Sequence, residues 1–114
     1  ERHAEATRRA VRTWGFEIQC SEPKEYSPVL TGVIMPSGHD ADALRSVILE
    51  KYNMSLGAGL GKIKGKVFRI GHLGDFNDLM LMGTLSGVEM GLASAGVPHN
   101  KGGAQAALDF LAGN

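Results

Sequence analysis

The sequence predicts an α+β fold: a small mixed, largely antiparallel sheet of three or four strands, covered by helices on one face. Two observations support this. Apolar residues recur at helical spacing in some segments and alternate with polar residues in others. Turn-rich stretches of Gly, Pro and Ser separate these segments. With 114 residues the chain is long enough for one modest core, so a single domain over residues 1–114 is expected.

The first half of the chain is predicted to form a helix, two strands and a second helix. The first helix covers Arg2–Trp14, where the less polar residues recur at helical spacing, and the glycine that follows ends it. The strands cover residues 16–20, where apolar and polar residues alternate, and Val29–Met35. The second helix runs from its expected N-cap, Asp40, through Asn53.

The second half is predicted to form a strand followed by two helices. A glycine-rich segment, Ser55–Lys66, leads into a strand over residues 67–71. Asp75 is the expected N-cap of a long helix over residues 76–95, and a short amphipathic helix over residues 103–111 ends the chain. The apolar stripe expected on the long helix consists of Leu79, Met82, Leu85, Val88 and Leu92.

The charge balance excludes partners that are recognised through a strong electrostatic field. Twelve Lys and Arg residues match twelve Asp and Glu residues, so we expect no attraction to nucleic acid or to an anionic membrane surface. Glu1 and Glu5 partly offset the one basic stretch, and we expect a solvated helix face there. That stretch consists of Arg2, Arg8, Arg9 and Arg12.

Cysteine and histidine usage predicts a cytoplasmic protein without a metal site. The single cysteine, Cys20, excludes an intrachain disulfide, and the four histidines lack the spacing of metal ligands. The sequence contains no Ser-His-Asp or Cys-His arrangement, so we expect no catalytic residue within this chain. The start at Glu1, without a methionine, predicts an excerpt of a longer protein, whose N-terminus would carry any targeting signal.

Two patterns favour ordinary structure over a specialised function. In Ser55–Lys66 no Ser or Thr follows a Lys and no helix follows the glycines, so we expect a loop or hairpin and not a phosphate-binding loop. Leu79–Val97 contains a single charge but is rich in small residues and lacks basic or aromatic flanks, which argues against a membrane span. Gly83, Gly87 and Gly91 instead predict close packing of this helix.

Arg69 is the candidate functional residue, because it interrupts an apolar, strand-like run. In a strand, Phe68 and Ile70 point into the core. Arg69 then shares the opposite face with Val67, where a half-buried guanidinium needs an anion and its planar fork fits a carboxylate. Two alternatives stay open: a clamp for a substrate carboxylate, or a salt bridge with an Asp or Glu of the same fold. His72 either lines the same site or caps local backbone.

Three segments carry a resemblance to a known family. They are GKVFRIGHLGD at Gly65–Asp75, FNDLMLMGTLSGVEMGLASAGVP at Phe76–Pro98 and RHAEATRRAVRTWG at Arg2–Gly15. The sequence resembles, over essentially its whole length, the C-terminal domain of the class V aminotransferases. It is most similar to the serine–glyoxylate and alanine–glyoxylate transaminases.

This resemblance implies that residues 1–114 are the small domain of a fold type I, homodimeric enzyme and pack over a large domain that binds pyridoxal 5′-phosphate. In that family the arginine of the RIG motif, here Arg69, holds the α-carboxylate of the amino acid and of glyoxylate. The large domain supplies the Schiff-base lysine and the acid for the pyridinium nitrogen. No lysine of this chain has the surroundings of that lysine; the lysines are Lys24, Lys51, Lys62, Lys64, Lys66 and Lys101.

The chain alone is therefore expected neither to bind pyridoxal phosphate tightly nor to transaminate. Its parent is expected to move an amino group from serine or alanine to glyoxylate. The alternative is a stand-alone binding or regulatory module that uses the Arg69 face for a small carboxylate or a protein partner. An upstream lysine-bearing domain would favour the enzyme, and a start codon near Glu1 would favour the module.

Overall fold

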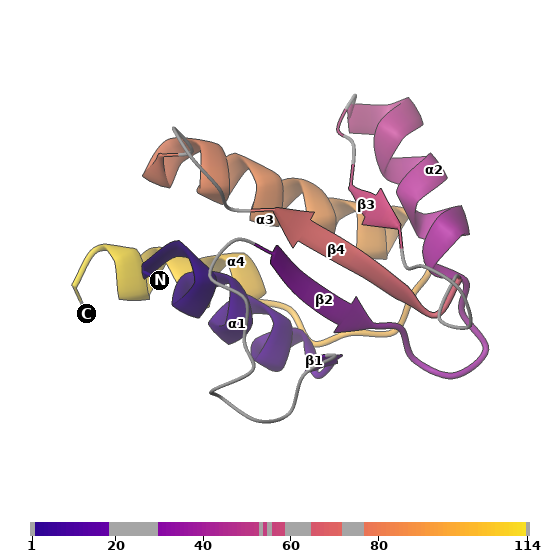
Figure 1. The fold of residues 1–114 in the computed structure, drawn as a ribbon, viewed down its shortest axis with the longest axis horizontal. Helices are drawn as coiled ribbons and strands as arrows, with labels where there is room; N and C mark the ends of the chain where they lie inside the picture. The colour runs from indigo at the N-terminus through magenta and orange to yellow at the C-terminus, as the bar shows by residue number, and fades with distance from the viewer. Residues whose placement is uncertain are drawn as a thin grey trace.

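The computed structural model describes residues 2–18, 30–52, 54, 56–58, 65–71 and 77–113. These residues form an α+β fold in which helices cover one face of a four-stranded sheet, as predicted (Figure 1). The helices are α1 (Arg2–Trp14), α2 (Ala41–Tyr52), α3 (Asp78–Ser94) and α4 (Gly103–Leu111). The strands are β1 (Glu17–Ile18), β2 (Leu30–Ile34), β3 (Gly57–Ala58) and β4 (Val67–Gly71).

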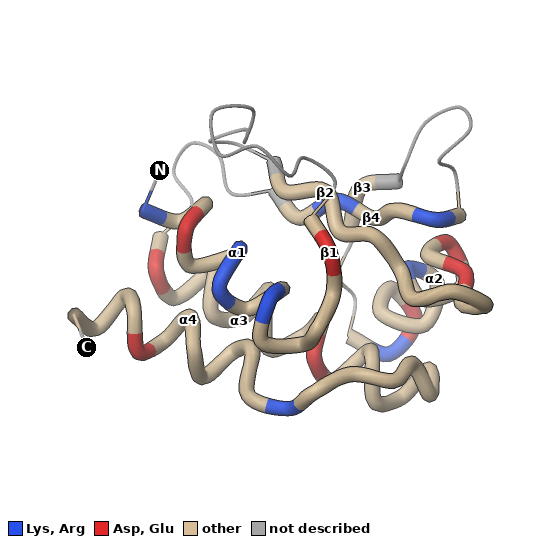
Figure 2. The backbone as a smooth tube through the Cα atoms, turned by 90° about the horizontal axis from the view of Figure 1, so that it is seen from below, with Lys and Arg blue, Asp and Glu red and all other residues tan. Residues whose placement is uncertain are grey.

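The described sheet is antiparallel throughout, with the strand order β1-β2-β4-β3. Val33 of β2 lies opposite Phe68 of β4, and both side chains are fully buried. Ile70 is fully buried on the same face, because side chains two residues apart in a strand point the same way. Figure 2 shows the helices gathered on one side of the sheet. The core therefore lies between this sheet face and the helices.

Helix α3 begins later than the sequence predicted. The expected N-cap, Asp75, lies outside the described residues, and the cap is Asn77. Asn77 has an extended backbone, and its side-chain oxygen accepts a hydrogen bond of 2.8 Å from the amide of Met80. This is the usual N-cap geometry, in which a short polar side chain satisfies an amide of the first turn. The helix therefore starts at Asp78.

The apolar stripe of α3 also differs from the prediction at its first residue. Leu79 is 83% exposed, whereas Leu81 is fully buried. Residues two apart on a helix are separated by roughly 200° around its axis, so only one of this pair can face the core. The buried stripe consists of Leu81, Leu85, Val88 and Leu92.

The predicted close packing of α3 occurs at two of its three spaced glycines. A Cβ atom at Gly87 would lie 2.9 Å from the Met54 methyl carbon, and one at Gly91 would overlap the side chain of Ile48. Around Gly83 a Cβ atom would meet nothing within 4 Å. Glycine at the first two positions therefore allows α2 and the segment after it to approach α3. No helix among the described residues is long and apolar enough to cross a membrane.

The basic stretch on α1 is not the fully solvated face that was expected. The Arg8 side chain is only 5% exposed, and its Nη2 donates to Glu5 Oε1 over 2.9 Å. Glu5 Oε2 accepts a further hydrogen bond of 2.9 Å from Arg9 Nε. Helix α1 contacts both α4 and the sheet, so its buried surface is wider than one stripe and includes an arginine paired with a carboxylate.

Glu89 of α3 joins α1 to the start of α4. Its carboxylate accepts hydrogen bonds from the buried Trp14 indole at 3.0 Å and from the amides of Ala104 at 2.9 Å and Gly102 at 3.1 Å. Burial raises the pKa of Glu89, but these hydrogen bonds, the one from Ala104 first, lower it more, so the net pKa is below its ordinary value. The carboxylate therefore satisfies the N-terminal amides of a helix that lacks a side-chain cap of its own.

Candidate functional site

Arg69 lies in the middle of β4, on the sheet face opposite the helices. Its neighbours Phe68 and Ile70 are fully buried on the helix-covered face, whereas Arg69 is half-buried. The alternation predicted for this strand is therefore confirmed. Val67 shares the face of Arg69 and is 2% exposed, so the stem of the arginine starts from an apolar surface. The guanidinium is thus carried by a rigid element whose other face is fixed in the core.

The strands on both sides of Arg69 contribute glycine at the adjacent position. Gly32 of β2 and Gly57 of β3 are the register partners of Arg69. Directly opposite residues in an antiparallel pair have Cβ atoms roughly 4.5–5.5 Å apart, so a side chain at either position would contact the arginine. The two flanking strands therefore place no side chain directly opposite Arg69.

No intramolecular anion for Arg69 is found among the described residues. Within these ranges the carboxylates that form ion pairs do so with other cations. The pairs are Glu5 with Arg8, Arg9 and Arg12, Asp42 with Arg45, and Asp78 with Arg2 and His3. The described part of the fold thus shows no salt bridge to Arg69.

The other predicted site residue, His72, lies outside the described residues. The described parts of the chain contain no group of three His, Cys, Asp or Glu residues that could hold a metal ion. Lys51, Lys66 and Lys101, the lysines within the described ranges, are all exposed. An exposed lysine lacks the desolvated surroundings that activate a nucleophilic lysine, so none of the three has the environment of a Schiff-base lysine.

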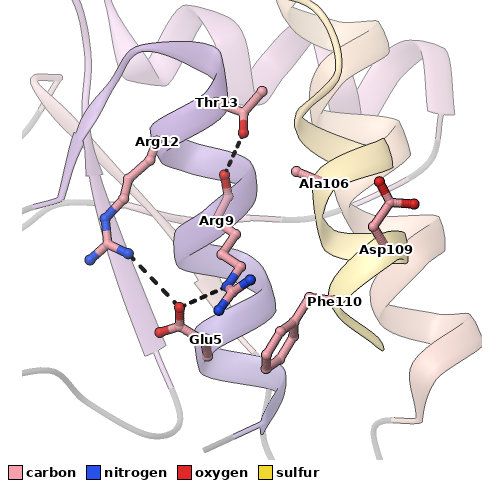
Figure 3. Close-up of a pocket in the computed structure, with 7 residues that line it drawn as sticks. All are labelled: Glu5, Arg9, Arg12, Thr13, Ala106, Asp109 and Phe110. Carbon is pink, nitrogen blue, oxygen red and sulfur yellow. Dashed lines mark hydrogen bonds and ion pairs between the residues drawn. The ribbon is translucent and has the colours of Figure 1, made fainter. Parts of the chain in front are cut away.

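A groove elsewhere on the fold, between α1 and α4, is lined by charges that compensate one another. Figure 3 shows that Arg9 and Arg12 both reach toward Glu5. The Arg9 guanidinium carbon also lies 4.3 Å from the centre of the Phe110 ring, and Asp109 lines the same groove. The groove belongs to the helix layer, on the other side of the sheet from Arg69. Its ion pairs lie within α1, and the contact of Arg9 with Phe110 joins α1 to α4, so the groove is not the site predicted from the sequence.

Sequence reasoning missed Gly32 and Gly57 as residues of the Arg69 site. The glycine-rich segment Ser55–Lys66 was interpreted as a loop or hairpin that leads into the next strand, and β3 does pair antiparallel with β4. The signal that could have identified Gly57 is that such a hairpin brings one of these glycines beside the arginine. Gly32 carried a weaker signal, because the register of β2 on β4 depends on tertiary packing.

Known proteins share both the sequence and the fold of this chain. No family model matches the sequence. The serine–glyoxylate aminotransferase of Methylorubrum extorquens is 44% identical over 99% of this chain and 29% of its own length. The serine–glyoxylate aminotransferase of Arabidopsis thaliana is 46% identical over 96% of this chain and 28% of its own length.

Among solved structures, the ureidoglycine–glyoxylate aminotransferase of Bacillus subtilis superposes with a TM-score of 0.87 and 26% identity. The match covers 97% of this chain and 29% of that protein. This chain therefore spans less than a third of the relatives it matches. Over its whole length the chain is homologous to the C-terminal part of serine–glyoxylate aminotransferases, and the solved structures that it resembles are class V aminotransferases.

Proposed function

We propose that the full-length protein is an aminotransferase that moves an amino group from serine or alanine to glyoxylate, and that residues 1–114 are its C-terminal small domain. The observation that carries the proposal is the position of Arg69: half-buried on the sheet face opposite the helices, between two glycines, with no anion among the described residues. The names of the relatives support the choice of substrates.

Arg69 binds the carboxylate that the two substrates have in common. In both the amino acid and glyoxylate the carboxylate is bonded directly to the reacting carbon, so one arginine can hold each in turn. Its planar guanidinium donates two parallel hydrogen bonds, which fix the orientation of the substrate as well as its position. Holding the reacting carbon in one place lowers the entropic part of the barrier. The small domain thus contributes binding and orientation.

The cofactor expected for the full-length enzyme is pyridoxal 5′-phosphate, which supplies the carbonyl group and the electron sink for amino transfer. The described residues of this chain do not form a binding site for pyridoxal phosphate, because the three lysines among them are exposed. The large domain would therefore hold the cofactor through its own lysine and acid, with the Arg69 face of the sheet turned toward it. We further propose a homodimer, as the family resemblance implies, and a cytoplasmic location, which the single cysteine supports.

The proposal is tested by assaying the purified full-length protein with serine, alanine and aspartate as donors and glyoxylate as acceptor. Glycine and the 2-oxo acid derived from the donor should form in equal amounts, and serine or alanine should give the highest kcat/KM. Addition of pyridoxal phosphate to the cofactor-free protein should restore turnover. Absence of glycine formation with every donor, in protein that retains the cofactor, would contradict the proposal.

A further inference from the structure

We infer that Gly57 is a positioning residue for Arg69: the missing side chain at residue 57 determines where the stem of the arginine lies on the sheet. This inference rests on the proposed function of Arg69. Gly57 pairs with Arg69 in the β3–β4 ladder. A Cβ atom at residue 57 would lie 3.1 Å from Arg69 Cβ and 3.8 Å from its Cδ. Two carbon atoms prefer roughly 3.5–4.0 Å, so an added methyl group would press against the base of the arginine side chain.

The backbone conformation of Gly57 does not by itself require glycine. The residue lies in a strand and is absent from the glycines with positive φ. Residue 57 is also exposed, so a methyl group there would not be excluded by the core. The contact that would change is the one with Arg69. Glycine at this position therefore affects the arginine rather than the path of the chain.

The segment before Gly57 is held in place from α2. Arg45 Nε donates a hydrogen bond of 2.8 Å to the backbone carbonyl of Leu56, and Arg45 Nη1 lies 3.2 Å from Asp42 Oδ1. Leu56 itself is only 6% exposed. Because this anchored residue directly precedes Gly57, β3 cannot easily move away from β4. A methyl group added at residue 57 would then press on Arg69 Cβ, which moves only with the β4 backbone, so the whole arginine side chain would shift with it.

A shift of this kind matters because a bidentate contact tolerates little displacement. The added methyl group would have to displace its neighbour by a few tenths of an ångström. A functional group has to be held within roughly 0.5 Å of its productive position. A displacement of about 1 Å can lower the rate about 100-fold, so a shift of a few tenths of an ångström is expected to lower kcat/KM about 3- to 10-fold.

The test is a double-mutant cycle in the full-length protein, with kcat/KM measured for serine and glyoxylate. Gly57→Ala should lower kcat/KM about 3- to 10-fold in the wild-type background and should have no further effect in the Arg69→Ala background. The matched control is Gly83→Ala, also an exposed glycine, whose Cβ atom would meet nothing within 4 Å. This control should leave kcat/KM within about twofold in both backgrounds.

Each other outcome identifies the claim that fails. A loss from Gly57→Ala of equal size in both backgrounds, or no loss in the wild-type background, overturns the positioning role. No loss from Arg69→Ala itself overturns the proposed function instead. If Gly57→Ala does not fold, Arg45→Met decides, because it removes the hydrogen bond to Leu56 and keeps an unbranched aliphatic stem. Arg45→Met should lower kcat/KM by about twofold or more only when Arg69 is present, and an equal loss in both backgrounds would refute the inference.

Discussion

The sharpest stability prediction concerns Gly91, where α3 approaches α2. A Cβ atom at residue 91 would overlap Ile48 Cγ1 and lie 2.7 Å from its Cδ1, and Ile48 is fully buried. Overpacking of a core costs about 1–3 kcal/mol, and the clash here predicts the upper end of that range. Replacing a glycine inside a helix by alanine raises the free energy of unfolding by about 1 kcal/mol through helix propensity. Gly91→Ala should therefore lower the free energy of unfolding by about 2 kcal/mol.

Gly83→Ala is the matched control on the same helix. Residue 83 is exposed and a Cβ atom there meets nothing within 4 Å, so only the gain in helix propensity remains. Gly83→Ala should raise the free energy of unfolding by about 0.5–1 kcal/mol. Urea unfolding followed by far-UV circular dichroism measures both variants. Glycine-to-alanine substitutions at residues 91 and 83 of the same helix are thus expected to change the free energy of unfolding in opposite directions, and the two variants should differ by about 2.5–3 kcal/mol.

A second variant tests the origin of the effect. Ile48→Val removes Cδ1 and should cost about 0.5–1.5 kcal/mol alone, but clearly less in the Gly91→Ala background, because it relieves part of the overlap. The reasoning would be refuted if Gly91→Ala were as stable as Gly83→Ala. Additive effects of Ile48→Val and Gly91→Ala would likewise show that the two side chains do not compete for space.

Two further predictions concern the helix junction and the isolated chain. Glu89→Gln should lower the free energy of unfolding by about 1–2 kcal/mol at neutral pH. Because the native pKa of Glu89 is lowered, its contribution to the free energy of unfolding is present above pH 4.5 and is lost as the pH falls below that value. Urea unfolding of the wild type and of Glu89→Gln should therefore give converging free energies of unfolding in acid. A difference in stability that stays constant with pH would disprove this origin. The purified 114-residue chain should show neither turnover nor the visible absorbance of bound pyridoxal phosphate, and measurable amino transfer by it would overturn the division of labour between the two domains.

The sequence predicted the fold class well because local signals and tertiary packing agree in most segments. The strand around Arg69 is the clearest case, since apolar residues on both sides of the arginine fix its face whatever surrounds the sheet. The start of α3 is harder to predict, because Asp75 and Asn77 are both acceptable caps. Leu79 and Leu81 are both apolar, and only the packing of α3 on the core determines that Leu81 is the buried one of the two.

Features that depend on distant contacts could not be predicted from the sequence. Arg8 looked like one of several solvated arginines, and only the packing of α1 against both α4 and the sheet buries it beside Glu5. Glu89 was merely the single charge in an apolar window, and its role appears once Trp14 and the start of α4 converge on it. Gly57 becomes part of the site only through the register of β3 on β4. In each case the partner is remote in the sequence.

The central claim is that Arg69 binds the substrate carboxylate. The most direct test compares kcat/KM of the full-length protein with that of its Arg69→Ala and Arg69→Lys variants, for serine, alanine and glyoxylate. Loss of a bidentate, charge-assisted contact should cost about 2–4 kcal/mol of transition-state stabilisation, which lowers kcat/KM roughly 30- to 1000-fold for all three substrates. The Arg69→Lys variant should recover only part of this kcat/KM. Unchanged kcat/KM in folded Arg69→Ala protein would contradict the claim and return Arg69 to a structural role.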